Sequence, residues 1–121
     1  MPYDLDYGGI SGEVLLPDGG RRTVKYAFAN ATGLGDTAVV AAVAGRKIRV
    51  LAYAFHAITA VAAHLRSATT PISATLNLGV TGGHVRPESR HGWVETVAGQ
   101  ALNVNLSAAV ATGVDVTYIE V

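Results

Sequence analysis

The residues of this sequence best suited to chemistry are a histidine, a tryptophan and a glutamate within five positions. His91, Trp93 and Glu95 belong to the stretch HGWVETVAGQALNVNLS, residues 91–107, and they share one face if this stretch begins as a strand. Such a set could be catalytic, could anchor a partner through the indole ring, or could close one end of a core. No local motif adds the nucleophile, base and orienting group that catalysis needs. The pattern therefore favours a capping or subunit-contact role for Trp93, with a partner-binding anchor as the alternative.

Metal binding by histidine is the next candidate chemistry. His56, His64, His84 and His91 include no close pair that would place two ligands on one strand or helix face. Only His84 and His91 could share a loop, in the segment HVRPESRH, where Glu88 is the one nearby carboxylate. One histidine from each subunit of a threefold assembly could also form a ring around an axis. The spacing itself predicts no metal site.

Two glycine-rich segments, GLGD at 33–36 and GVTGG at 79–83, could be mistaken for phosphate loops. A phosphate loop is followed directly by a helix and, in the P-loop, by a lysine and a hydroxyl residue, and neither follows here. The two segments are interpreted as turns between strands. No catalytic residue and no cofactor is predicted, and the chain is expected not to be an enzyme.

The composition limits the class of protein. A chain of 121 residues is the size of one domain. Charged residues make up only 15%, against a usual share of about 25%, and the mean hydropathy is +0.32. Because a small domain has a large surface for its volume, so little charge predicts that other subunits or a partner cover part of it. Nine basic and nine acidic residues cancel without long runs of one sign, which argues against nucleic-acid and membrane binding.

The elements that would position these residues are strands. Turn signals such as PDGG at 17–20 and AGRK at 44–47 recur about every dozen residues, and alternating runs such as QALNVNLS lie between them. We therefore predict a single-domain, all-β antiparallel sandwich of about eight strands, in the form of a jelly roll. Residues 1–12 are expected to be a flexible N-terminal arm, and residues 13–121 the sandwich.

Three segments carry more specific predictions. EVLLPDGGRRTVKYAF is expected to form a hairpin, with Asp18 and Gly19 in its turn. RKIRVLAYAFHAITAVAAHLRSA is alanine-rich enough to suggest a helix, but its β-branched and aromatic residues favour two strands joined near residues 57–60. In GVDVTYIEV the alternation changes at Ile119, which predicts a bulge or a subunit contact.

The first of the two central strands is apolar on both faces from Val50 to Phe55. A strand of this kind is expected to be buried by the core on one side and by a neighbouring subunit on the other. The predicted subunit or partner interface consists of Val50, Ala52, Tyr53, Phe55, Val61 and Trp93. Trp93 is expected near one end of this interface.

Three blocks of the chain resemble small structural proteins of tailed bacteriophages and prophages. The blocks are VAGRKIRVLAYAF at 43–55, ISATLNLG at 72–79 and GWVETVAGQALNVNLSAAVATGVDVTYIEV at 92–121, of which the third is the most specific. The resemblance implies a virion protein made in the bacterial cytoplasm: a capsid decoration or cement protein, or a β-domain of tails and fibres, often trimeric. It implies the phage major capsid protein or a tail protein as partner, and no active residues.

The expected function is that of a trimeric capsid decoration protein that binds and stabilises the capsid surface. Many weak contacts on a symmetric shell would add up through effective concentration. A carbohydrate- or receptor-binding module of a tail or fibre is the alternative, and it would need several exposed aromatic residues on one sheet face. A small hydrolase or isomerase would need a clustered metal or acid–base set, which the sequence does not show.

Overall fold

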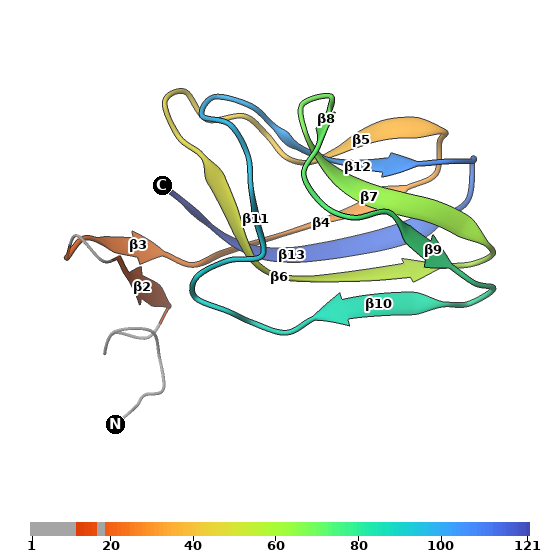
Figure 1. Ribbon diagram of the computed structural model, residues 1–121, viewed down its shortest axis with the longest axis horizontal. Coiled ribbons are helices and arrows are strands. Elements are labelled where there is room, and N and C mark those ends of the chain that lie inside the picture. Colours follow the sequence, from red (N-terminus) through yellow and green to blue (C-terminus); the bar gives the residue numbers. More distant parts are fainter. Residues whose placement is uncertain (1–11, 17–18) are drawn as a thin grey trace.

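The computed structural model of the chain describes residues 12–16 and 19–121, so the predicted arm lies outside the described residues except for Gly12. The described residues contain strands and no helix, and thus no helix able to span a membrane. The predicted all-β antiparallel sandwich is confirmed (Figure 1). Residues 12–16 and 19–121 contain twelve strands instead of the expected eight or so, because several short edge pairings form strands of their own. They are β2 (Glu13–Leu15), β3 (Arg21–Thr23), β4 (Lys25–Ala31), β5 (Gly35–Val40), β6 (Ile48–Ala57), β7 (Val61–Ser67), β8 (Thr70–Pro71), β9 (Leu76–Leu78), β10 (Gly83–Arg86), β11 (Val94–Glu95), β12 (Leu102–Leu106) and β13 (Thr112–Glu120).

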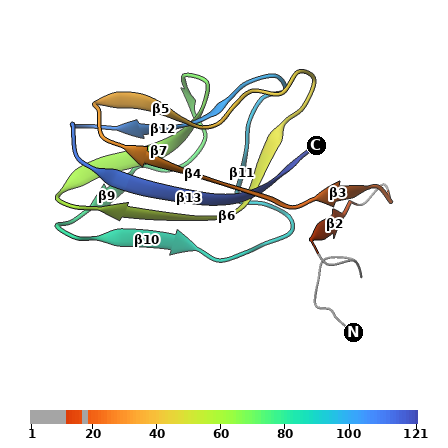
Figure 2. The same cartoon turned by 180° about the vertical axis from the view of Figure 1, so that it is seen from behind.

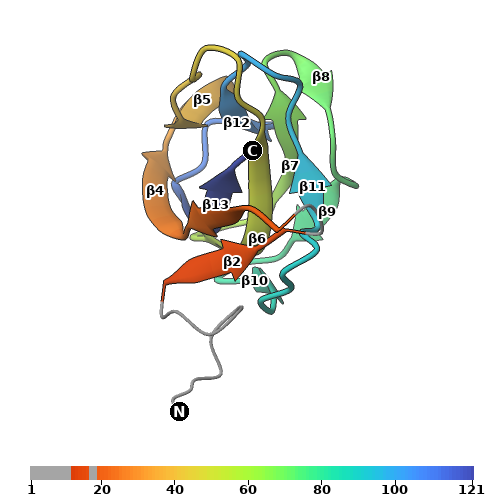
Figure 3. The same cartoon turned by 90° about the vertical axis from the view of Figure 1, so that its left-hand side faces the viewer.

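Two five-stranded antiparallel sheets form the sandwich. Sheet A has the order β10-β6-β13-β4, with β11 also paired to β6, and sheet B has the order β5-β12-β7-β8, with β9 also paired to β7. Seen from behind, β4, β13, β6 and β10 run side by side (Figure 2). An end-on view shows the two sheets as two layers (Figure 3). The chain crosses between the sheets at each step from β4 to β7, so strands distant in sequence lie side by side in both sheets.

The main core lies between the sheets and follows the alternation of the strands. β12 has the predicted pattern, with every second side chain buried, and β13 has the same pattern up to Tyr118. The two strands predicted in the alanine-rich segment are confirmed as β6 and β7, and the turn between them leads from sheet A to sheet B. The sequence ISATLNL at 72–78 alternates between apolar and polar residues as a strand would, but only Leu76–Leu78 pairs with β7.

A short N-terminal hairpin covers one end of the outer face of sheet A. β2 pairs with β3 as predicted, and Gly19 in the turn has a φ of 88°, whereas Asp18, predicted for the same turn, lies outside the described residues. The hairpin ends at Thr23, because the next strand, β4, joins sheet A. Val14 and Val24 pack with Leu51 and Ile119 in a second, smaller core. The two cores are separate because strand alternation places Ile119 on the face opposite to Tyr118.

The predicted irregularity near Ile119 is a β-bulge, and it lies on the neighbouring strand. Thr117 pairs with Ala52 and Tyr118 pairs with Val50, so Leu51 of β6 is the extra residue. The bulge turns Leu51 outward, where the hairpin buries it completely. The prediction that a neighbouring subunit covers the second apolar face of β6 is therefore wrong at this position, because the same chain covers it.

Thr96 clamps the start of β6 to the segment after β11. Its backbone N–H donates to the Ile48 carbonyl at 3.0 Å, and its Oγ1 accepts the Ile48 N–H at 2.9 Å. Both residues are buried. Thr96→Val keeps the shape but leaves a buried N–H without its acceptor, so we expect the free energy of unfolding to fall by about 1–3 kcal/mol. Urea unfolding measures this, with the exposed Thr59→Val as the matched control; equal values for both variants would contradict the clamp.

Candidate functional site: an apolar trough on sheet A

The two outer faces of the sandwich have opposite character. The outer face of sheet B is polar and internally bonded. Asn105 Nδ2 donates to Asp36 Oδ1 at 2.9 Å, Arg66 pairs with Asp36 at 3.6 Å, and Asn103 Nδ2 donates to a backbone carbonyl at 2.9 Å. The Arg66 Nε also donates to His64 Nε2 at 2.8 Å. Because these groups satisfy one another, this face has little reason to bind a partner.

His64 makes the sheet B face sensitive to pH. Burial, together with the positive charge of Arg66, lowers the pKa of His64 below its usual 6.5, and Asp36 opposes the shift only in part. The unfolded chain therefore takes up a proton at His64 more readily than the folded chain. We expect the stability to fall as the pH decreases from above 6.5 through the lowered pKa, and to level off below it. His64→Gln should remove this part of the pH dependence in urea unfolding; an unchanged profile would contradict the assignment.

The outer face of sheet A carries an apolar trough beside the N-terminal hairpin. The two central strands, β6 and β13, form a floor of small or short side chains, and the outer strands, β4 and β10, supply bulkier walls. The hollow has a volume of about 550 Å³. Its floor residues are Ala52, Ala54, Asp115 and Thr117, and its wall residues are Tyr26, Phe28, Val85 and Pro87.

The walls are far more exposed than apolar side chains usually are. Tyr26 is 76% exposed, Phe28 71% and Val85 67%. In β4 the small residues Ala29 and Ala31 face the core, so alternation forces Tyr26 and Phe28 outward. Large exposed apolar patches on small proteins mark interaction sites. This face therefore has the properties of a binding surface.

The polar groups of the trough are few and lie on its floor and rim. Asp115 and Thr117 contribute a carboxylate and a hydroxyl group from β13, and Arg86 lies at the β10 side. A second hollow of about 330 Å³ continues along the same face past His56 and Gly113. None of the hydrogen bonds found among the described residues joins these side chains into a nucleophile–base pair. The arrangement suits recognition of a partner, with the carboxylate fixing orientation.

Comparison of the chain with protein-family models, curated proteins and solved structures gave no match. What the trough can bind therefore follows from its own geometry. Its lining combines apolar walls with a narrow polar strip, as in the centre of many protein interfaces.

The structure corrects the predicted interface residues. Val50, Tyr53, Phe55 and Val61 are buried in the core of the single chain, so their side chains offer almost no surface to a partner. The reason is strand parity: Val50, Tyr53 and Phe55 point from β6 toward sheet B, and the residues between them point outward, while Val61 faces the same core from β7. Ala52 is the exception, because it lies on the outward face and forms part of the trough floor.

The apolar surface expected from the composition is thus present, but on other residues. Tyr26 and Phe28 were not predicted to belong to it. A signal for them existed in the segment KYAFAN, where Asn30 has the same parity as both aromatic residues. A polar residue on their face indicates that this face is outward.

Trp93 lies apart from the trough floor, just before β11, and it is 40% exposed. Its Nε1–H donates to the Pro87 carbonyl at 2.6 Å, and the guanidinium of Arg86 lies 5.0 Å from the ring centre. These contacts hold the two ends of the connection between β10 and β11 together, and the Trp93 backbone N–H attaches the connection to β6 by donating to the Val50 carbonyl at 2.8 Å. They support the capping role among the alternatives for Trp93, while the exposed part of the ring remains accessible.

The residues around Trp93 do not form a catalytic set. Glu95 binds Arg49 at 2.8 Å and Lys47 at 3.7 Å, and His91 lines a separate hollow beside the hairpin. His84 lies on β10 with its ring 6.0 Å from that of Tyr53, so it does not share a loop with His91. Within residues 12–16 and 19–121, no three histidine, aspartate or glutamate side chains are placed to hold a metal ion.

Proposed function

We propose that this chain is a non-enzymatic structural protein of a phage virion, a homotrimeric capsid decoration protein whose copies associate through the trough. The observation that carries the self-association is the exposed aromatic wall formed by Tyr26 and Phe28. The virion setting is supported by the resemblance of the three sequence blocks to tailed-phage structural proteins. The partner in the shell is the major capsid protein.

A second copy of this chain is the proposed occupant of the trough. The shortage of charge in the whole chain already favours subunit contacts, and the trough brings the exposed apolar side chains of Tyr26, Phe28 and Val85 together on one face. Aromatic side chains at the centre of an interface supply much of its binding energy. The polar, internally bonded face of sheet B offers no comparable surface.

We also propose that the sandwich is a jelly roll. The proposal is supported by the strand orders of the two sheets, in which successive strands from β4 to β7 alternate between sheets. It is further supported by the position of β13, which lies between β6 and β4 in sheet A. Jelly rolls are common in viral capsid proteins.

Light scattering of the purified chain tests the self-association. We expect three times the 12.5 kDa mass of one chain. The double variant Tyr26→Ser/Phe28→Ser should weaken association at least about thirtyfold and give single chains at micromolar concentration, because the loss of even one central interface aromatic costs about 2 kcal/mol or more. Sedimentation with empty capsids of the encoding phage tests the shell partner, and the same variant should bind less.

The matched control is Leu34→Ser/Ile58→Ser, which removes two exposed apolar side chains outside the trough. This control should leave both the mass and the capsid binding unchanged. A monomeric wild-type chain, or a control that dissociates as readily as the trough variant, would overturn the proposed interface. If the wild-type chain stays in solution when the capsids sediment, the decoration role is overturned.

A carbohydrate-binding module is the second candidate, and one observation favours it. Tyr26 and Phe28 stand two residues apart on one sheet face, with the oxygens of Asp115 and Thr117 beside them. Sugar rings stack on aromatic faces while their hydroxyl groups bind to such oxygens. Binding to a glycan array that is lost in Tyr26→Ser/Phe28→Ser would favour this function over decoration.

A further inference from the structure

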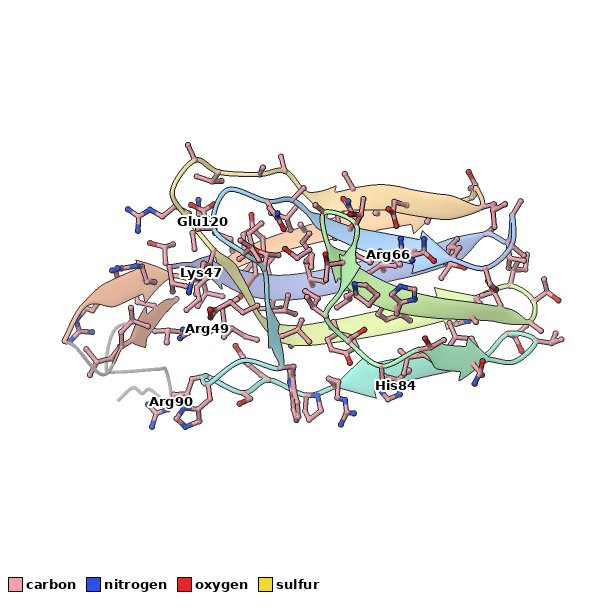
Figure 4. All side chains as sticks on the ribbon, turned by 45° about the horizontal axis from the view of Figure 1, so that its top comes forward. Lys47, Arg49, Arg66, His84, Arg90 and Glu120 are labelled. Atoms are coloured by element: carbon pink, nitrogen blue, oxygen red, sulfur yellow. The ribbon has the colours of Figure 1, made fainter. Side chains whose placement is uncertain are left out.

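Most of the positive charge of the chain gathers at one end of the sandwich. Arg21 and Arg22 lie on β3, Lys25 begins β4, and Arg46 and Lys47 precede β6. Lys47, Arg49 and Arg90 lie toward the hairpin end, whereas Arg66 lies toward the other end (Figure 4). The chain as a whole has nine basic and nine acidic residues, so this concentration is a product of the fold.

A hollow of about 340 Å³ lies within this basic end. Its charged lining consists of four cationic side chains and one carboxylate, namely Arg21, Arg22, Lys25, Arg46 and Glu120. The carboxylate is already engaged, because Glu120 Oε2 accepts from Lys25 Nζ at 3.3 Å. We refer to this site as the basic hollow.

Two arginines of the basic hollow are available for a ligand. Arg22 and Arg46 form no ion pair with any of the described residues. The Nη1 of Arg22 donates to the Arg21 carbonyl at 3.0 Å, but its Nε is shielded from solvent and has no acceptor in the described part of the chain. A shielded donor without an acceptor costs free energy, and a bound anion could remove that cost after a small movement of the side chain.

The position of Arg22 and Arg46 is held by the backbone around them. Arg22 lies in the middle of β3, paired with Val14 of β2. Arg46 follows a turn at Gly45, and its N–H donates to the Val43 carbonyl at 3.1 Å while its own carbonyl accepts the Gly99 N–H at 2.8 Å. Two guanidinium groups on separately anchored segments can approach one ligand from two sides.

We propose that the basic hollow binds the carboxylate groups of an acidic segment of a partner protein. Guanidinium groups bind carboxylates through paired, charge-assisted hydrogen bonds, which makes arginine well suited to this ligand. Nucleic acid fits less well, because none of the described residues that line the hollow is an aromatic residue able to stack on a base, and the cations do not form a stripe along one face. The proposal is independent of the trough and of the virion role.

Fluorescence anisotropy with a labelled hexaglutamate peptide tests the proposal on the full chain. We expect saturable binding that weakens between about 50 mM and about 200 mM salt. Arg22→Gln/Arg46→Gln should lower the affinity at least about tenfold, because it removes two charge-assisted contacts. The control is Arg90→Gln, because Arg90 lines a different hollow. This variant also loses one positive charge, but it should change the affinity by no more than about twofold.

A single-stranded oligonucleotide of equal charge is the competing probe. Weaker binding of the oligonucleotide than of the peptide supports the proposal, and equal or tighter binding overturns it. Peptide binding that is unaffected by Arg22→Gln/Arg46→Gln also overturns it. Thermal unfolding shows that the variants are folded, and Tyr26→Ser/Phe28→Ser should bind the peptide as the wild type does, which separates this site from the trough.

Discussion

Leu65→Ala is expected to lower the free energy of unfolding by about 2–5 kcal/mol. Leu65 lies on β7, has no exposed surface and belongs to the main core. It pairs with Val104 of β12, another fully buried residue, and thus lies well inside sheet B. Truncation removes buried apolar surface and leaves a cavity that close-packed neighbours fill only in part. For a domain of this size, such a loss is a large share of the total stability.

Urea unfolding at neutral pH measures the effect of Leu65→Ala, and Leu34→Ala is the matched control. Leu34 carries the same side chain in an exposed position between β4 and β5. The control should change the stability by no more than about 0.5 kcal/mol. A similar loss of unfolding free energy in both variants would mean that the main core does not lie between the two sheets.

Ile119→Ala is expected to cost about 2–5 kcal/mol for a different reason. Ile119 is fully buried, but in the small core beneath the N-terminal hairpin. Its truncation should loosen the contact with Val14 and Val24 as well as lower the global stability. The variant should therefore increase the rate of hydrogen exchange more at the paired amides of β2 and β3 than at the amides of β12.

The control for this variant is Ile58→Ala, since Ile58 is exposed in the turn between β6 and β7. It should leave the exchange of the hairpin amides unchanged. Retained protection of the hairpin in Ile119→Ala would show that the hairpin is held by contacts other than those with sheet A.

The local pattern of the chain was sufficient to predict much of the fold. The alternation in QALNVNLS predicts the buried side chains of β12, and the strand formers of the alanine-rich segment predict β6 and β7 instead of a helix. These features could be predicted because alternation and turn chemistry depend on neighbours in sequence. The small strands β8 and β11 could not, because two-residue pairings depend on which strand lies beside them.

The candidate site was predictable in kind but not in its residues. Composition predicts more apolar surface than one small domain can bury, but it does not predict which face of β6 exposes that surface. The bulge at Leu51 and the hairpin above it decide that question, since they bury Leu51 and leave Ala52 open. The aromatic wall on β4 likewise depends on Ala29 and Ala31 being the inward residues.

By itself, the sequence determined an all-β, turn-rich and weakly charged domain, because these properties follow from composition and from contacts between near neighbours. Only the tertiary structure decided that Val50 and Phe55 are core, that Tyr26 and Phe28 form one wall of a trough, and that scattered arginines meet at one end. The physical reason is that sheet partners are chosen by long-range pairing. Which side chains share a face of the molecule depends on the strands that this pairing brings together.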